Sequence, residues 1–243
     1  MAKVLRDAAC PVGKTCPRIE RTDGGYNIVG TSIPDDGLPA HERKVHVPAS
    51  MLPELGALDI TDFEAWLRER RMSPGDMLRI QTLDRYGVPS DDADFAGYLE
   101  GAPAPTSPYR EPFFEELRAG VAAKMRWRNL HVIRQPLSDY LRYAFEWVYT
   151  YSCEAGQEIR ILDLDEQPTA AVLQRTGDFW VVEHQHVALV RYDDQRRHQG
   201  EVAVEDTSAT GYVAAGELAW HLGVPFADWW AAHPQYRRAG QAA

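Results

Sequence analysis

Cysteine is scarce in this sequence, and long apolar runs are missing from it. The three cysteines, Cys10, Cys16 and Cys153, are an odd number in a chain of 243 residues, which does not suggest a disulfide framework. No run of about 18 apolar residues occurs, so no segment is predicted to span a membrane. The first residues also lack the apolar core of a signal peptide. These absences predict a soluble protein of the reducing cytoplasm.

Positive charge is also in short supply. The chain has 26 Lys and Arg against 36 Asp and Glu, which gives a formal net charge of −10. A nucleic-acid coat protein needs a positive footprint, so nucleic acid is disfavoured as a partner, although a local basic patch is compatible with this balance. Arginine supplies nearly all of the positive charge and alanine is abundant, which indicates a GC-rich genome such as that of an actinobacterium.

Short catalytic motifs are a further absence. The sequence has no G-x-S-x-G, H-E-x-x-H, G-x-G-x-x-G or Walker pattern. The acidic run Asp163, Asp165 and Glu166 follows a predicted strand, where catalytic carboxylates can lie, but no partner motif accompanies it. A solvated edge is the simpler interpretation of this run. We expect no cofactor, and the pattern favours a non-catalytic protein over an enzyme.

The centre of the chain reads as a strand, a long helix and a second strand. Residues 129–134 are rich in Leu, Val and Ile and predict the first strand. The helix is expected to begin near Pro136, whose fixed φ and missing N–H suit a first turn. It is expected to run to about Cys153, with Gly156 as a left-handed stop. Residues 158–162 predict the second strand, and this unit is the expected heart of the fold.

Shorter patterns surround this unit. The turn Asp23-Gly24-Gly25 predicts a hairpin between residues 18–21 and 26–30, and Thr61 is expected to cap a helix. Further predicted strands are 44–47, 77–83, 179–182, 187–192 and 201–204, with a turn at 183–185, and further predicted helices are 91–98, 111–125, 212–222 and 225–233.

These elements predict an α+β fold. We expect a mixed β-sheet with helices mainly on one face, preceded by a small N-terminal β module. The predicted boundaries are 1–58 for the module, 59–238 for the main domain and 239–243 for a disordered tail. The segment Gly101–Pro108 is either a linker or a loop inside the main domain.

The densest basic cluster contains four arginines interspersed with aromatic residues: Arg126, Arg128, Arg134 and Arg142. Basic and aromatic groups together can bind a phosphate or single-stranded nucleic acid. In that alternative the protein is a toxin-like RNase or a phosphoryl-transfer enzyme, with Tyr140 or Glu158 as the acid or base. Strand alternation equally allows these arginines to pair with nearby carboxylates, and structural ion pairs are the favoured interpretation.

One set of residues resembles a zinc site: Cys10, Cys16, His41 and His46. The H-x4-H spacing suits a finger-like site, but the C-x5-C spacing is wider than the common gap. Two loop cysteines with two histidines near a strand are the favoured alternative. His184 and His186 fall at the predicted 183–185 turn, so they are interpreted as turn residues and not as a metal-binding pair.

The blocks RWRNLHVIRQPLSDYLRYAFEW, AGQEIRILDL and DFWVVEHQHVALVRYD, with a terminal PFADWWAAHPQYRR, carry a family resemblance. Over about residues 60–238 the chain resembles the actinobacterial domain of unknown function 6879. Where that family often has Glu after Arg-Tyr, this chain has Ala144, and Glu146 would have to take its place. The earlier CPRIERTDGGYNIVG resembles a small uncharacterised actinobacterial module in which one cysteine, matching Cys16, is usual.

The resemblance implies a function of a general kind. Members of that family are often encoded beside helix-turn-helix regulators and small partner proteins. We therefore expect a non-catalytic regulatory or interaction protein with a protein partner, which by this analogy is a transcriptional regulator. Nucleic-acid or nucleotide processing by the arginine cluster is the alternative hypothesis.

Overall fold

The computed structural model describes residues 57–105, 110–204 and 208–238, and only backbone strands in the residues before them. The chain divides into two compact units, residues 1–57 and 58–243, so Gly101–Pro108 falls within the second unit. The expected tail at 239–243 lies outside the described residues.

The first unit contains five short strands. β1 (Lys3–Asp7), β2 (Arg18–Thr22) and β3 (Gly25–Val29) form an antiparallel sheet, and β4 (Thr31–Ser32) pairs with β5 (Val45–His46). The predicted hairpin is present, because Thr22 pairs with Gly25 across its turn. The sequence patterns did not predict β1 or β4.

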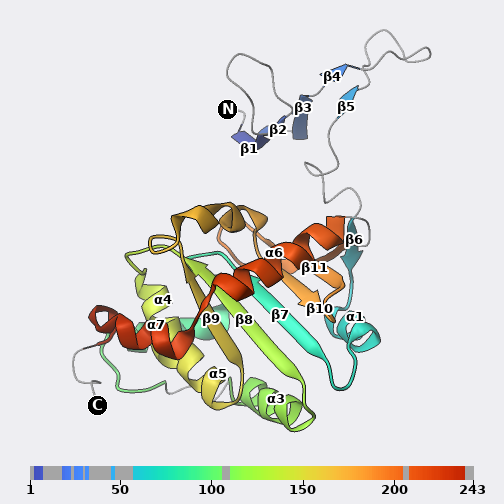
Figure 1. Cartoon of the computed structure of the whole chain (residues 1–243). Coiled ribbons are helices and arrows are strands. Elements are labelled where there is room, and N and C mark those ends of the chain that lie inside the picture. The colour runs from blue at the N-terminus through green and yellow to red at the C-terminus, as the bar shows by residue number, and fades with distance from the viewer. Residues whose placement is uncertain are drawn as a thin grey trace. The chain divides into compact units, whose positions relative to one another are not determined.

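The second unit is organised around an eight-stranded mixed sheet in the order β13-β9-β8-β7-β10-β11-β12-β6 (Figure 1). Its centre is parallel, with β7 beside β8 and β8 beside β9, while β10, β11 and β13 pair antiparallel. The strands are β6 (Ala57–Ile60), β7 (Asp76–Gln81), β8 (Arg126–Ile133), β9 (Glu158–Asp163), β10 (Phe179–Val182), β11 (His186–Tyr192), β12 (His198–Val204) and β13 (Val224–Pro225).

The described helices cover both faces, with most of them on one. They are α1 (Phe63–Arg70), η3 (Pro89–Asp91), α2 (Asp92–Leu99), α3 (Glu111–Ala122), α4 (Asp139–Tyr143), η5 (Ala144–Tyr149), α5 (Thr150–Glu154), η6 (Pro168–Thr176), α6 (Ser208–Leu222), α7 (Phe226–Ala232) and η7 (Pro234–Tyr236). Side chains alternate along each strand, so Leu78 and Leu130 pack in the layer under α6 and η6. Met77 and Trp127 face the other way, against α1 and α3. The predicted α+β class is confirmed, and Figure 1 shows α6 crossing the sheet.

The central strand–helix–strand unit is present, with one correction. α4, η5 and α5 form one continuous helical run whose middle, η5, is π-helical. The helix does not begin near Pro136: Ser138 is its N-cap, because the Ser138 hydroxyl accepts a 3.1 Å hydrogen bond from the Leu141 N–H. Similarly, Asp62 and not Thr61 caps α1, by accepting from the Ala65 N–H at 2.9 Å.

The helical run ends at Gly156, as predicted. This residue has φ +100°, and a Cβ added there would lie 2.8 Å from Cγ2 of Val121 on α3. A side chain would therefore meet both an unfavourable backbone conformation and a steric clash.

We expect Gly156→Ala to lower the free energy of unfolding by at least about 1–2 kcal/mol, measured by urea denaturation. Gly211→Ala is the matched control, because Gly211 lies inside α6 with open space where its Cβ would be. That control should raise stability by roughly 0.5–1 kcal/mol. Equal effects of the two substitutions would show that the helix stop does not depend on glycine.

Candidate functional site

The four clustered arginines lie in ion pairs or hydrogen bonds at two ends of the sheet. Arg126 at the start of β8 makes two hydrogen bonds to Glu158, at 3.1 and 2.9 Å. Arg128 is 1% exposed and pairs with Asp76 and Glu217. These two arginines lie at the amino end of β8, and Arg134 follows its carboxyl end, so the cluster does not surround one cleft.

The other two arginines also have partners. Arg134 donates to the Gln174 side chain at 3.2 Å and lies 3.9 Å from an Asp165 oxygen. Arg142 donates to Asp139 at 3.4 Å and to the backbone carbonyl of Tyr236 at 3.2 Å.

Tyr140 and Glu158, the candidate acid or base, are not brought together. Tyr140 is buried and donates to Asp91 at 2.9 Å, and its pKa is raised by burial and by the Asp91 charge. Glu158 begins β9 at the opposite end of the sheet, and its hydrogen bonds from Arg126 lower its pKa. A phenol with a raised pKa stays protonated at neutral pH and is a poor general base.

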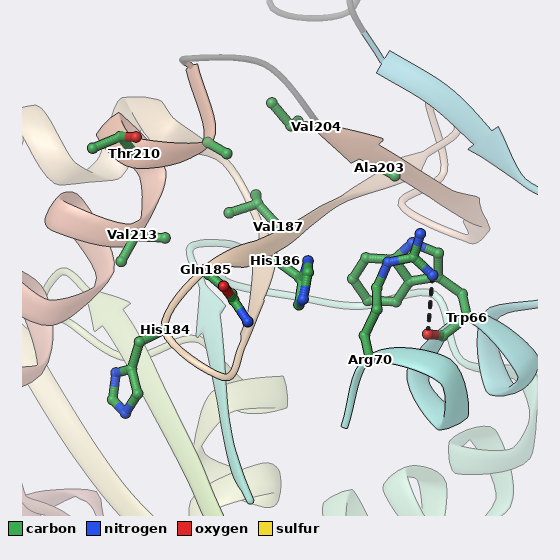
Figure 2. Close-up of a pocket in the computed structure, with 11 residues that line it drawn as sticks. Trp66, Arg70, His184, Gln185, His186, Val187, Ala203, Val204, Thr210 and Val213 are labelled. Atoms are coloured by element: carbon green, nitrogen blue, oxygen red, sulfur yellow. Dashed lines mark hydrogen bonds between the residues drawn. The ribbon is translucent and has the colours of Figure 1, made fainter. Parts of the chain in front are cut away.

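The structure describes the side chains of only some of the remaining candidate residues. The side chains of Cys10, Cys16, His41 and His46 lie outside the described residues. His184 sits in the predicted turn and contacts Glu217 at 3.0 Å, while His186 begins β11 with its ring 6.5 Å from that of Trp66. Figure 2 shows the two imidazoles pointing in different directions, and both residues line a cavity of about 470 Å³. This cavity has a largely apolar wall that includes Val187, Ala203, Val204, Ala209 and Val213.

A second cavity, of about 260 Å³, has a different character. It lies over the carboxyl-terminal halves of β7 and β8, on the face covered by α4 and η5. Open sheets with parallel strands commonly bind ligands beyond the carboxyl ends of those strands. We name it the tyrosine pocket, and its lining includes Arg79, Gln81, Tyr86, His131, Tyr140, Ala144, Tyr149 and Tyr192.

One wall of the tyrosine pocket is organised by Asp178, which precedes β10 and is 4% exposed. Its Oδ1 accepts from the backbone N–H and the hydroxyl of Thr82, at 2.8 and 2.9 Å. Its Oδ2 accepts from the hydroxyls of Tyr86 and Tyr192, at 2.8 and 2.9 Å, and from Arg79 at 3.2 Å. Asp178 therefore ties the end of β7, the following loop, β10 and β11 to one buried charge.

The opposite wall contains His131. Its Nε2 lies 2.8 Å from the Leu83 carbonyl, and its Nδ1 lies 2.6 Å from the Tyr149 hydroxyl. A carbonyl only accepts, so Nε2 carries the proton and Nδ1 is left as the acceptor in the neutral ring. Burial lowers the pKa of His131, which keeps this tautomer at neutral pH.

The tyrosines of the pocket are neutral, and the hydroxyls of Tyr86 and Tyr192 donate their protons to Asp178. Burial is the main cause that raises the pKa of Tyr86, Tyr149 and Tyr192, and the Asp178 carboxylate raises all three further. Burial alone would lower the pKa of Arg79, but Tyr192 and Asp178 raise it, so the guanidinium stays charged. The pocket thus offers ring faces, hydroxyl oxygens and the guanidinium of Arg79, which is paired with Asp178.

Ala144, where the family resemblance leads us to expect a glutamate, lies in the tyrosine pocket. Ala144, the first residue of η5, lines the cavity. Glu146 does not take its place, because Glu146 accepts from Tyr98 at 3.1 Å and from Arg238 at 2.8 Å, and neither residue lines this cavity. A small apolar side chain therefore lines the pocket at this position.

Sequence reasoning missed Asp178 and the pocket. The one available signal was the acidic residue directly before Phe179-Trp180, inside a block that carries the resemblance. Cys153 is a half-buried free thiol, and burial raises its pKa to about 11, so it stays protonated at neutral pH.

Comparison with known families gives one match. The family model described as "Domain of unknown function (DUF6879)" matches residues 61–231. The chain belongs to this family. No curated protein matches it. The matched DUF6879 region contains the whole tyrosine pocket and Asp178. Among the described residues, no helix is long and apolar enough to cross a membrane.

We expect Asp178→Asn to lower the free energy of unfolding by roughly 3–5 kcal/mol, because it leaves the buried Arg79 charge without its anion. Chemical denaturation measures this loss. Asp194→Asn is the matched control, since Asp194 is exposed in the loop after β11, and it should change stability by less than about 0.5 kcal/mol. Similar small effects for both would contradict the central role of Asp178.

Proposed function

We propose that this DUF6879 protein is a non-catalytic regulatory protein of the actinobacterial cytoplasm. It binds a small ligand in the tyrosine pocket and acts through a protein partner, a helix-turn-helix regulator. The observation that supports this proposal is the chemistry of the pocket wall, which combines tyrosine rings with the Arg79 guanidinium. Ring faces and a guanidinium are suited to recognition, whereas proton abstraction needs a base with a pKa near neutrality.

The pocket limits the ligand by size and chemistry. Its volume of about 260 Å³ lies just below the range of about 300–1,000 Å³ typical of drug-sized ligands. The tyrosine rings favour a planar molecule, and the Arg79 guanidinium favours a carboxylate or carbonyl group. A free nucleobase or a small aromatic acid meets both requirements.

The alternative, nucleic-acid or nucleotide processing, needs arginines that can meet a phosphate. Arg126 and Arg128 instead lie in ion pairs with Glu158, Asp76 and Glu217. The net charge of −10 also opposes an approach to a polyanion. The binding hypothesis therefore has the stronger physical support.

Filling the pocket tests the ligand. We expect Ala144→Leu to weaken binding at least about tenfold, because the larger side chain occupies the cavity. Saturation-transfer NMR on the full chain, with free nucleobases and benzoate-type acids as probes, measures the change. Ala214→Leu is the matched control, since Ala214 is exposed on α6, outside the pocket lining. Undiminished binding to Ala144→Leu, or no probe binding to the unmodified chain, would contradict the pocket assignment.

Affinity capture tests the partner. We expect the tagged full chain to retain a helix-turn-helix protein from a lysate of its source organism, with and without nuclease treatment, as read by mass spectrometry. Nuclease resistance separates direct protein contact from bridging by DNA or RNA. Nucleic acid that co-purifies and disappears with nuclease would instead favour the processing alternative.

A further inference from the structure

A second polar cluster lies at the carboxyl ends of β8 and β9. Asp163 is the last residue of β9, Glu166 follows three residues later, and His233 directly follows α7. One ligand atom from each of the three side chains lies within 4.8 Å of the other two. We name this group the Asp163 cluster, and its residues do not line the tyrosine pocket.

Asp163 is a buried carboxylate with neutral partners. It is 1% exposed. Its Oδ2 accepts from the Gln135 amide at 2.7 Å and from the Trp229 indole at 3.3 Å, and its Oδ1 accepts from the Asp165 backbone N–H at 3.0 Å. In the part of the chain that the structure describes, each of these donors is uncharged. A buried charge is normally paired with a counter-charge or coordinates a metal, so this carboxylate needs a cation.

His233 is oriented toward the cluster by its own helix. Its Nδ1 lies 2.8 Å from the Trp229 carbonyl, which can only accept, so Nδ1 carries a proton. The imidazole also stacks on the Trp229 ring, with centroids 4.0 Å apart and planes 14° apart. The side chain is 10% exposed, and its Nε2 faces a Glu166 oxygen at 3.1 Å. This is the arrangement of metal-ligating histidines, whose second nitrogen is held by a carbonyl or carboxylate.

We infer that Asp163, Glu166 and His233 bind a divalent first-row transition metal ion, Zn²⁺ or Mn²⁺. Two donors at about 2.0–2.2 Å from one ion lie at most about 4.4 Å apart, close to the spacing of this cluster. The imidazole favours these ions over Mg²⁺ and Ca²⁺, which prefer oxygen ligands alone. The ion supplies the positive charge that buried Asp163 needs.

The proposed site can be reached from solvent, and a bound ion has a structural effect. The Glu166 side chain is 45% exposed, which gives an ion a path from bulk water. The ligands join the end of β9 to the end of α7, so the metal stabilises the attachment of α7 to the sheet. Three protein ligands leave a coordination position for water or a small ligand. This inference is independent of the proposed ligand in the tyrosine pocket.

Titration of the metal-free full chain with Co²⁺, and then with Zn²⁺ or Mn²⁺, tests the inference. The chain should carry Cys10→Ser and Cys16→Ser, so that the separate zinc candidate in the first unit does not contribute. We expect one equivalent of Co²⁺ to bind, with visible d–d absorption and no thiolate charge-transfer band. Calorimetry with Zn²⁺ or Mn²⁺ should show the same stoichiometry and a higher melting temperature with metal.

Single substitutions in that background locate the site. We expect Glu166→Gln and His233→Gln each to weaken metal binding at least about tenfold. Glu166 is partly exposed, so its substitution tests the site even if the His233 variant fails to fold. Glu116→Gln is the matched control, because Glu116 is exposed on α3, and it should bind metal like the parent. No binding by the parent would instead indicate an imidazolium–carboxylate pair, and unchanged binding by Glu166→Gln would equally overturn the inference.

Discussion

The tyrosine pocket depends on the buried charge of Asp178. Arg79 is the cation paired with it, and Thr82, Tyr86 and Tyr192 supply neutral donors. Hydrogen bonds to a buried charge are stronger than neutral ones, and leaving one unmade has a large cost. The same interactions that hold β7, β10 and β11 together therefore fix the rings of Tyr86 and Tyr192 in place. In this protein the rigidity of the fold and the shape of the pocket have one physical cause.

The parallel centre of the sheet explains why both candidate sites lie where they do. Gln81 pairs with His131, and Ile133 pairs with Asp163. Residues paired across strands point to the same face, so this register places the pocket beside the end of β7 and the Asp163 cluster beside the end of β9. At the amino end of β8, Arg126 and Arg128 lie in ion pairs with carboxylates. The polar groups of β8 thus lie in ion pairs at its amino end, and His131 lines the tyrosine pocket near its carboxyl end.

The sequence predicted the parts of the fold that local patterns control. The strand at 158–162, the Gly156 stop and the turn at 183–185 depend on residues that are close in the chain, and all three are present. The partners of Arg128 lie 52 and 89 residues away, and Tyr86 lies 92 residues from Asp178. No periodicity encodes such separations, so the sequence favoured ion pairs for the arginines without identifying the partners of Arg128, and it did not reveal the pocket.

A run of packed rings joins the two candidate sites. The ring of Phe145 lies 6.3 Å from His131 in the pocket wall and 5.6 Å from Trp229, and Trp229 stacks on His233 at 4.0 Å. Phe145 is fully buried, and close-packed interiors transmit displacement because they have little free volume. Packed rings therefore connect His131, in the wall of the tyrosine pocket, to His233 in the Asp163 cluster. In the proposed function, these rings form the packed contact between the ligand site and the metal site.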